Sequence, residues 1–287
     1  MPKRLPKISI VTPSYNQGTF IERTISSVLS QKYPNLEFII MDGKSTDQTV
    51  SILKKYSSKL IWESKKDGGQ TQAINEGLRK STGEILAYLN SDDTYAPHTL
   101  HTIAHFFQTH PEEHFVYGHG RLIDSDDNEI GFYNDSAMTN ESLFAACGIS
   151  QPTCFWRRDV LEEFGYFDES YRFTMDYEYW VRVSKKFKLH YLPIVLANSR
   201  IHPDAKTSSF THKLHSEALR VSLTHYGRVH YDWIFTYTDS AYSGQKGSKE
   251  YYRFMLIRSL VNYWKYNHSI PPIAGRKILM DWLKQAI

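Results

Sequence analysis

Over the first hundred residues, apolar positions come in short unbroken runs that alternate with segments of helical spacing. An unbroken apolar run bounded by turn residues is typical of a strand buried on both faces of a sheet. Apolar residues that recur every three or four positions indicate an amphipathic helix. Strands and helices that alternate in this way form βαβ units with right-handed crossovers, so we expect a mainly parallel sheet. The predicted strands are residues 8–13, 36–41, 59–63 and 84–90, and helical spacing marks residues 21–29, 49–56, 73–78 and 100–107.

In the second hundred residues the pattern predicts that the sheet becomes mixed. The apolar runs 115–123 and 129–133 flank the polar turn 125–128, which is typical of a hairpin and adds an antiparallel pair. Residues 175–183 have helical spacing, and residues 189–201 form a further extended segment. We therefore expect an α/β fold with a mixed, mainly parallel central sheet flanked by helices.

After residue 205 the chain changes character. Residues 212–226, 250–266 and 273–287 have helical spacing and are rich in aromatic and aliphatic side chains. The sequence therefore predicts an α/β domain over residues 1–205 and a helical C-terminal region over residues 206–287.

The polar loops that follow the predicted strands share one edge of the sheet, because the carboxyl ends of parallel strands meet there. Open α/β sheets bind ligands at this edge. The loop after the fourth strand contains Asp92 and Asp93, and adjacent acids repel unless a cation or hydrogen-bond donors compensate. A magnesium ion bridging to phosphate oxygens would compensate, since it usually takes one or two protein carboxylates. The other interpretation is that both acids cap a helix that Pro97 opens.

Composition and missing motifs exclude several classes of protein. The formal net charge of the 287 residues is only +3, which argues against a dedicated nucleic-acid binder. Neither GxGxxG nor a P-loop motif occurs, so neither a Rossmann dinucleotide site nor an NTPase site is supported. Cys147 and Cys154 form no disulfide framework and no CxxC metal motif. Since no run approaches 18 apolar residues and the N-terminus lacks a signal-peptide pattern, we expect a cytoplasmic protein.

Five spaced motifs resemble those of the inverting nucleotide-sugar glycosyltransferases of family 2. The resemblance covers about residues 8–205 and implies the GT-A fold, which is Rossmann-like. The motifs are Thr12-Pro13-x-Tyr15-Asn16 and Asp42-Gly-x-Ser-Thr46-Asp47 after the first two strands, Asn75-x-Gly77, Asn90-Ser-Asp92-Asp93 after the fourth strand, and Met175-Asp176-Tyr-Glu178-x-Trp180-x-Arg182.

The resemblance implies a role for each of these strand ends. Asp92 matches the metal ligand of the family, with Asp93 as its neighbour, and Asp176 matches the catalytic base. His202 lies at a strand end before a proline, which suits a metal or phosphate contact, although a lone histidine is more often structural. The residues expected at the nucleotide-sugar donor are Pro13, Tyr15, Asp42, Asp67, Asn90 and Ser91, and those expected near the acceptor are Gln151, Trp156 and Glu178.

The resemblance implies an enzyme that transfers a sugar from a nucleotide-diphosphate sugar to a hydroxyl of a glycan or lipid-linked acceptor. It further implies that the transfer inverts the anomeric carbon, needs Mn2+ or Mg2+, and serves polysaccharide, O-antigen or other glycan assembly. Asn90 and Met175 stand where acids are common in the family, which keeps a non-catalytic nucleotide-binding relative open as an alternative. A glycoside hydrolase with an acid and base pair is a further alternative.

The C-terminal region alternates basic and aromatic residues at 251–258 and 264–266. This composition suits a helix that lies in the headgroup layer of a membrane. We therefore expect contact with the inner face of the membrane or with a lipid-linked acceptor. A helix that covers the catalytic core, or a contact between two subunits of a homodimer, explains the same residues.

Overall fold

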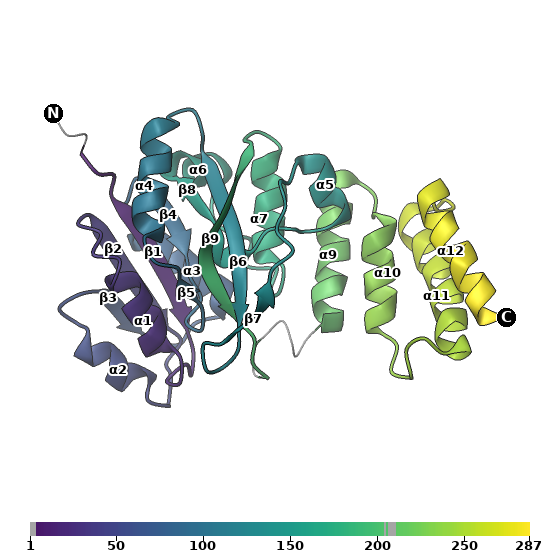
Figure 1. Cartoon of the computed structure of the whole chain (residues 1–287), viewed down its shortest axis with the longest axis horizontal. Helices are drawn as coiled ribbons and strands as arrows, with labels where there is room; N and C mark the ends of the chain where they lie inside the picture. The colour runs from purple at the N-terminus through teal and green to yellow at the C-terminus, as the bar shows by residue number, and fades with distance from the viewer. Residues whose placement is uncertain (1–3, 204, 206–210) are drawn as a thin grey trace. The chain divides into compact units, whose positions relative to one another are not determined.

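The apolar runs of the first two hundred residues pair into one mixed sheet, as the sequence predicts. The computed structural model describes residues 4–203, 205 and 211–287, and in this part of the chain the sheet has nine strands. Their order is β3-β2-β1-β4-β8-β6-β9-β5, and β7 pairs with β6 (Figure 1). The strands are β1 (Ile8–Ser14), β2 (Leu36–Asp42), β3 (Ile61–Ser64), β4 (Ile85–Tyr88), β5 (Thr94–Tyr95), β6 (Phe115–Ile123), β7 (Glu129–Phe132), β8 (Phe155–Arg157) and β9 (Leu189–Arg200).

Parallel pairing joins β3, β2, β1 and β4, so their carboxyl ends lie at one edge. Strand β8 is antiparallel to both of its neighbours, and β9 again runs parallel to β6. The predicted hairpin is confirmed as β6 and β7. The two-residue strand β5, which pairs with β9, was not predicted because so short a segment has no periodicity.

The described residues fall into two units, one within residues 1–139 and 148–205 and the other within 140–147 and 206–287. The predicted boundary after residue 205 adjoins residues 206–210, which lie outside the described residues. The helices of the first unit are α1 (Ile21–Leu29), α2 (Thr49–Lys55), α3 (Gln70–Lys80), α4 (Thr99–Thr109), α6 (Arg158–Phe164) and α7 (Met175–Ser184), with the short 3-10 helix η1 (Gln151–Thr153). Those of the second unit are α5 (Asn140–Ala145), α9 (Thr211–Tyr226), α10 (Tyr231–Ser240), α11 (Lys249–Asn267) and α12 (Ile273–Ala286).

Alternating residues of the parallel strands pack on opposite faces of the sheet. Ile10 and Ile40 belong to the large core that includes residues of α1, α2 and α4, whereas Ile39 and Met41 pack with Ala73 of α3. This alternation follows from the two-residue period of a strand. The sheet is therefore covered on both faces, as the unbroken apolar runs predict.

Gly77 allows α3 to pack close to the sheet. A Cβ atom at this position would come within 2.4 Å of Val11 Cγ1 and 3.3 Å of Met41 Cγ. Because a buried helix cannot shift without disturbing its neighbours, only glycine fits here. This close packing fixes α3 against the sheet, and with it the start of the helix at Gln70, three residues after Asp67.

The second unit has a hydrophobic core of its own. Leu219, Val229, Ile234, Phe235 and Leu279 form this core. None of the helices described in either unit is long and apolar enough to cross a membrane.

At the amino ends of the strands, Glu37 is held by several donors. Lys7 Nζ donates to Glu37 Oε1 at 2.6 Å, Ser9 Oγ donates to Oε2 at 2.5 Å, and Thr82 N donates to Oε2 at 2.7 Å. Burial by itself raises the pKa of Glu37, but these hydrogen bonds outweigh it and lower the pKa to about 2. The cluster joins β1, β2 and the loop before β4 at the edge opposite the acidic turns.

We predict that Glu37→Gln destabilises the fold at pH 7 by about 1–3 kcal/mol, the usual range for lost hydrogen bonds to a charged group. The pKa of Glu37 falls from 4.5 to about 2 on folding. The ionised carboxylate therefore contributes stability that is complete above about pH 4.5 and is lost as the pH falls toward 2. Urea denaturation at pH 7 and pH 3 should show a smaller difference between the two proteins at pH 3. The control is Glu112→Gln at an exposed carboxylate, and an equal effect of both substitutions at pH 7 would contradict the account.

Candidate active site

The carboxyl ends of β1, β2 and β3 meet at Asp42. Asp42 is paired in register with Ser14 on one side and Ser64 on the other, and its side chain is buried. Asp42 Oδ2 accepts hydrogen bonds from Ser64 Oγ at 2.5 Å and from Ser45 N at 3.0 Å, and Oδ1 accepts one from Ser45 Oγ. The carboxylate thus fixes the start of the loop that follows β2.

Asp67 lies beside this loop, over Gly43. A Cβ atom at Gly43 would come within 3.1 Å of Asp67 Oδ2, so glycine makes room for the carboxylate. Burial raises the pKa of Asp67, a hydrogen bond from Gly69 N opposes the rise, and the negative charges of Glu76 and Asp42 add to it. The carboxylates of Asp42 and Asp67 therefore lie near each other at the carboxyl ends of β2 and β3.

Tyr15 follows β1 on a loop that is tied to the loop after β2. Asn16 N donates to Ser45 Oγ at 2.8 Å, and Asn16 Oδ1 accepts from Thr46 N at 2.9 Å. Asn16 has a positive φ of 52°, a conformation that asparagine tolerates well. Pro13 is buried in β1, whereas the Tyr15 side chain is 62% exposed. The result is an exposed aromatic ring on a fixed loop next to Asp42.

Asn90 connects three elements at the end of β4. Its Oδ1 accepts a hydrogen bond from Gln70 Nε2 at 2.7 Å, and its Nδ2 donates to Asp93 Oδ2 at 3.2 Å and to Gln151 Oε1 at 3.3 Å. Gln151 Nε2 in turn donates to the carbonyl of Tyr88 at 2.9 Å. An amide can donate and accept at the same time, which an ionised acid cannot do. This explains why asparagine fits the position, and Ser91 next to it is buried in the turn.

Asp92 and His202 form a pair at the accessible side of the acidic turn. His202 Nε2 lies 3.1 Å from Asp92 Oδ2, with side-chain exposures of 4% and 21%. The imidazole ring packs on Phe20, with ring centroids 4.8 Å apart. The structure therefore brings together two side chains that lie 110 positions apart in the sequence.

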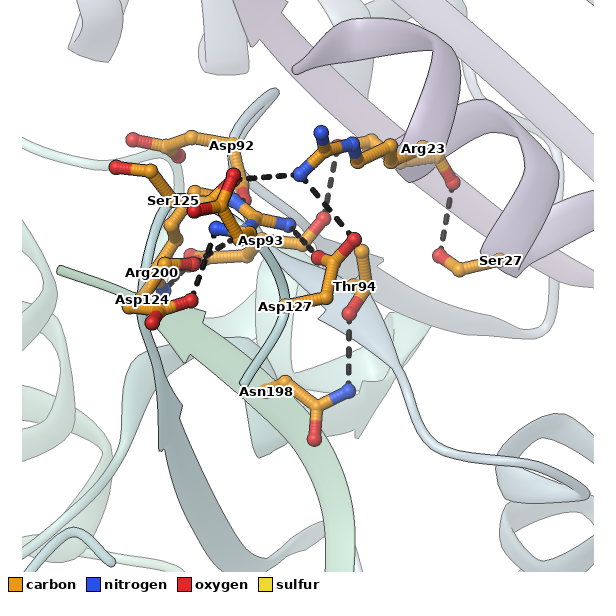
Figure 2. A network of polar contacts seen from close by, with 12 residues as sticks. Arg23, Ser27, Asp92, Asp93, Thr94, Asp124, Ser125, Asp127, Asn198 and Arg200 are labelled. Carbon is orange, nitrogen blue, oxygen red and sulfur yellow. Dashed lines mark hydrogen bonds and ion pairs between the residues drawn. The ribbon is translucent and has the colours of Figure 1, made fainter. Parts of the chain in front are cut away.

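Arg200 holds the acidic turn from the inside, a role that no motif in the sequence indicates. Its Nε donates to the carbonyl of Asp92 at 2.9 Å, its Nη1 to the carbonyl of Asp124 at 2.7 Å, and its Nη2 to Asp127 Oδ1 at 2.5 Å. The guanidinium is fully buried. Figure 2 shows Arg200 between the acidic turn and the turn after β6.

Asp93 points into the protein and is not accessible. Its Oδ1 accepts a hydrogen bond from the backbone N of Arg200 at 2.9 Å, and its side chain is buried. Burial and the neighbouring charge of Asp92 raise the pKa of Asp93 to about 8. Hydrogen bonds from Arg200 N to Oδ1 and from Asn90 Nδ2 to Oδ2 compensate the Asp93 carboxyl, which relieves the predicted repulsion between the two acids. Of the two carboxylates, Asp92 is the one that a ligand can reach.

The Asp92–His202 pair is a donor set for a divalent cation, but it is an incomplete one. Within residues 4–203, 205 and 211–287, no three His, Cys, Asp or Glu side chains are grouped so that they could hold a metal ion. Magnesium and manganese take carboxylate oxygens readily, and imidazole is a common ligand of transition metals. The pair therefore fits a cation that receives its remaining ligands from water or from a phosphate.

Asp176 lies in the first turn of α7 and is partly exposed. The segment that leads into α7 is attached to the first turns of α3, since Thr71 Oγ1 donates to the carbonyl of Tyr171 at 3.0 Å and Asn75 Nδ2 to that of Phe167 at 2.9 Å. These bonds connect the chain before Asp176 with the helix that follows Asp67.

Two residues expected near an acceptor have structural roles. Trp156 has no exposed surface and packs among Phe115, Tyr179 and Trp180. Glu178 is buried and accepts two hydrogen bonds from Arg182, at 2.9 and 2.8 Å. Neither side chain can contact an acceptor directly in this structure. A tryptophan at the end of an apolar run suits a core as well as a binding site, and only the three-dimensional structure distinguishes the two.

Comparison with known proteins identifies the family. The family described as glycosyl transferase family 2 matches residues 9–165, which include the loops after β1, β2 and β4. An uncharacterised glycosyltransferase of Rickettsia typhi is 30% identical over 217 residues, which cover 71% of this chain and 66% of the relative. A PGL/p-HBAD biosynthesis glycosyltransferase of Mycobacterium bovis is 27% identical over 200 residues, covering 67% of this chain and 76% of the relative. Other rickettsial relatives are longer, and the matched region spans 37% of the one from Rickettsia conorii.

Solved structures show the same fold. S. aureus TarS in complex with UDP-GlcNAc has a TM-score of 0.66 and 16% identity, covering 98% of this chain and 88% of that chain. A mannosyltransferase from Pyrobaculum calidifontis in complex with GDP-Man and Mn2+ has a TM-score of 0.60 and 18% identity, covering 99% and 87%. The expected α/β fold, with its mixed sheet and C-terminal helices, is therefore confirmed. The match to the family covers more than half of the residues of this chain. The chain therefore belongs to glycosyl transferase family 2.

Proposed function

We propose that this chain transfers a sugar from a nucleoside-diphosphate sugar to an acceptor hydroxyl, with inversion of the anomeric carbon and with the help of a divalent cation. The observation that carries the proposal is the grouping of Asp42, Asp67, Asn90 and Asp92 at the carboxyl ends of adjacent parallel strands in a family 2 glycosyltransferase. Two structural neighbours support the choice of donor, since one contains UDP-GlcNAc and another contains GDP-Man with Mn2+.

The loops after β1, β2 and β3 form the proposed site for the nucleoside. Carboxylates accept hydrogen bonds from ribose hydroxyls and from the N–H groups of a base, and Asp42 and Asp67 are the carboxylates at this end of the edge. An aromatic ring can stack on a base, and Tyr15 offers an exposed ring on a fixed loop beside Asp42. Pro13, Asn90 and Ser91 position the turns around these groups.

The Asp92–His202 pair is the proposed place for Mn2+ or Mg2+, with Asp93 as a buried support. The pair offers one carboxylate and one imidazole nitrogen 3.1 Å apart, which leaves further positions for phosphate oxygens. When bound, the cation would offset the negative charge that builds on the departing diphosphate. Arg200 keeps the backbone of Asp92 in place for this contact.

Asp176 is the proposed general base. A carboxylate in the first turn of a helix interacts favourably with the helix dipole, and the side chain of Asp176 is partly exposed. Its oxygen takes the proton of the acceptor hydroxyl while the hydroxyl oxygen bonds to the anomeric carbon and the bond to the diphosphate breaks. Attack from the face opposite the diphosphate inverts that carbon.

The acceptor is proposed to be a hydroxyl of a glycan or a lipid-linked saccharide, and we further propose that the enzyme serves polysaccharide assembly in the cytoplasm. Gln151 is buried like Trp156 and Glu178, but its hydrogen bond with Asn90 links it to the end of β4, so we assign it an indirect role in positioning the turn beside the acceptor. No nucleic-acid partner is proposed, because the chain carries little net charge overall.

The first test is Asp176→Asn. We predict that turnover falls on the order of 10²–10⁴-fold, the usual contribution of a general base, while the affinity for UDP or GDP with Mn2+ stays within about twofold because the amide keeps the shape of the side chain. Turnover is measured as release of nucleoside diphosphate from the nucleotide sugar that raises the melting temperature most. Glu162→Gln at an exposed position of α6 is the control. Normal turnover of Asp176→Asn would remove Asp176 from the mechanism, and absence of any turnover in the unmodified protein would favour a non-catalytic nucleotide binder.

The second test is Asp92→Ala. We predict that Mn2+ no longer strengthens binding of UDP or GDP, because the substitution removes the only carboxylate of the proposed Asp92–His202 pair. Isothermal titration with and without Mn2+ measures this directly. Asp126→Ala removes an exposed acid from the turn after β6 and serves as the matched control. If Asp92→Ala and the unmodified chain respond equally to Mn2+, the cation does not bind at Asp92.

A further inference from the structure

Helix α11 is apolar on two opposite faces. One face packs into the second unit, where Met255 and Ser259 are buried and Leu256 and Tyr263 contact the core. Met255, which suggested a membrane surface in the sequence, is therefore an interior residue, and Leu256 is partly buried against the same core. The opposite face exposes a row of apolar side chains at helical spacing, namely Ile257 (61% exposed), Leu260 (41%), Val261 (55%) and Trp264 (59%).

Helix α12 repeats this arrangement. Leu279 packs inside, and the exposed apolar side chains are again spaced so that they lie along one side of the helix. In Figure 1, α11 and α12 lie side by side near the C-terminus, and residues of the two helices are in contact. The exposed row on the helix consists of Ile273 (67%), Met280 (54%) and Leu283 (37%), and Ile287 (79%), which directly follows the helix, is exposed as well.

The C-terminal segment that contains these two helices has a net positive charge larger than that of the whole chain. Residues 249–287 contain seven Lys and Arg and two Asp and Glu, which gives a formal net charge of +5, whereas the whole chain carries +3. The other 248 residues therefore sum to −2. Arg258 and Lys265 are exposed next to the row on α11, and Arg276 and Lys277 are exposed next to the row on α12.

We infer that α11 and α12 form a docking surface for an anionic lipid bilayer. A helix that exposes aliphatic residues and a tryptophan between basic residues suits the boundary between headgroups and acyl chains. Anionic headgroups compensate the +5 charge, and each Lys or Arg near such a surface contributes to binding. A second copy of this chain would cover the apolar rows but would bring two positive surfaces together. A nucleic acid would compensate the charge but would leave the aliphatic rows exposed to water.

The test is flotation of the full chain with lipid vesicles. We expect the protein to float with vesicles that contain phosphatidylglycerol and phosphatidylcholine, and to stay at the bottom with phosphatidylcholine alone. Replacing Arg258, Lys265 and Arg276 with Gln should weaken binding at least about tenfold, because each basic residue contributes roughly fivefold near an anionic surface. The matched control replaces Lys32, Lys54 and Lys59, which are exposed in the first unit, and should bind like the unmodified chain.

A second variant tests the apolar rows. Ile257, Val261 and Trp264 are exposed, so their replacement with Ser should leave the melting temperature nearly unchanged while vesicle binding falls at least about tenfold. The control replaces three residues of the first unit that are similarly exposed, Ile61 (53%), Ile130 (53%) and Phe132 (54%), with Ser. Equal binding of both variants would overturn the inference. The inference would also be overturned if the unmodified chain did not bind vesicles but formed a dimer, and if replacing Ile257, Val261 and Trp264 made that dimer dissociate.

Discussion

The buried guanidinium of Arg200 is the interaction on which the candidate active site depends. Its three nitrogens bind the carbonyl of Asp92, the carbonyl of Asp124 and the side chain of Asp127, and its backbone N binds Asp93. A buried guanidinium needs all of these acceptors, since an unpaired buried charge is costly. Arg200 therefore fixes the turn so that Asp93 faces inward and Asp92 faces His202 and solvent. The adjacent acids coexist because the backbone N of Arg200 and the side-chain amide of Asn90 donate hydrogen bonds to the Asp93 carboxyl.

The sheet supports this turn through one carboxylate at the amino ends of its strands and another at their carboxyl ends. Glu37 joins β1, β2 and the loop before β4 at the amino ends, and Asp42 fixes the loop after β2 at the carboxyl ends. The register of the parallel strands is therefore set on both sides of the core. As a result, loops that are far apart in the sequence present their polar groups at one edge of the sheet.

The periodicity of apolar residues predicted most of the strands and helices and the shared edge of the polar loops, because buried runs and amphipathic segments are local signals. It missed β5, which has two residues, and α10, whose apolar positions are interspersed with Thr and Tyr. Arg200 was missed because its partners lie about 75 to 110 positions away and share no motif with it. Trp156 and Glu178 were placed near the acceptor because a motif does not show which side chains are buried.

The central claim is that Asp92 and His202 hold a cation beside a nucleoside diphosphate at the carboxyl edge of the sheet. The most direct measurement is an anomalous difference map from crystals grown with UDP or GDP and Mn2+. The account predicts a manganese peak in contact with Asp92 Oδ2 and His202 Nε2, with the diphosphate on its other side. A nucleotide bound at this edge with manganese elsewhere, or a nucleotide bound away from Asp42 and Asp92, would contradict it.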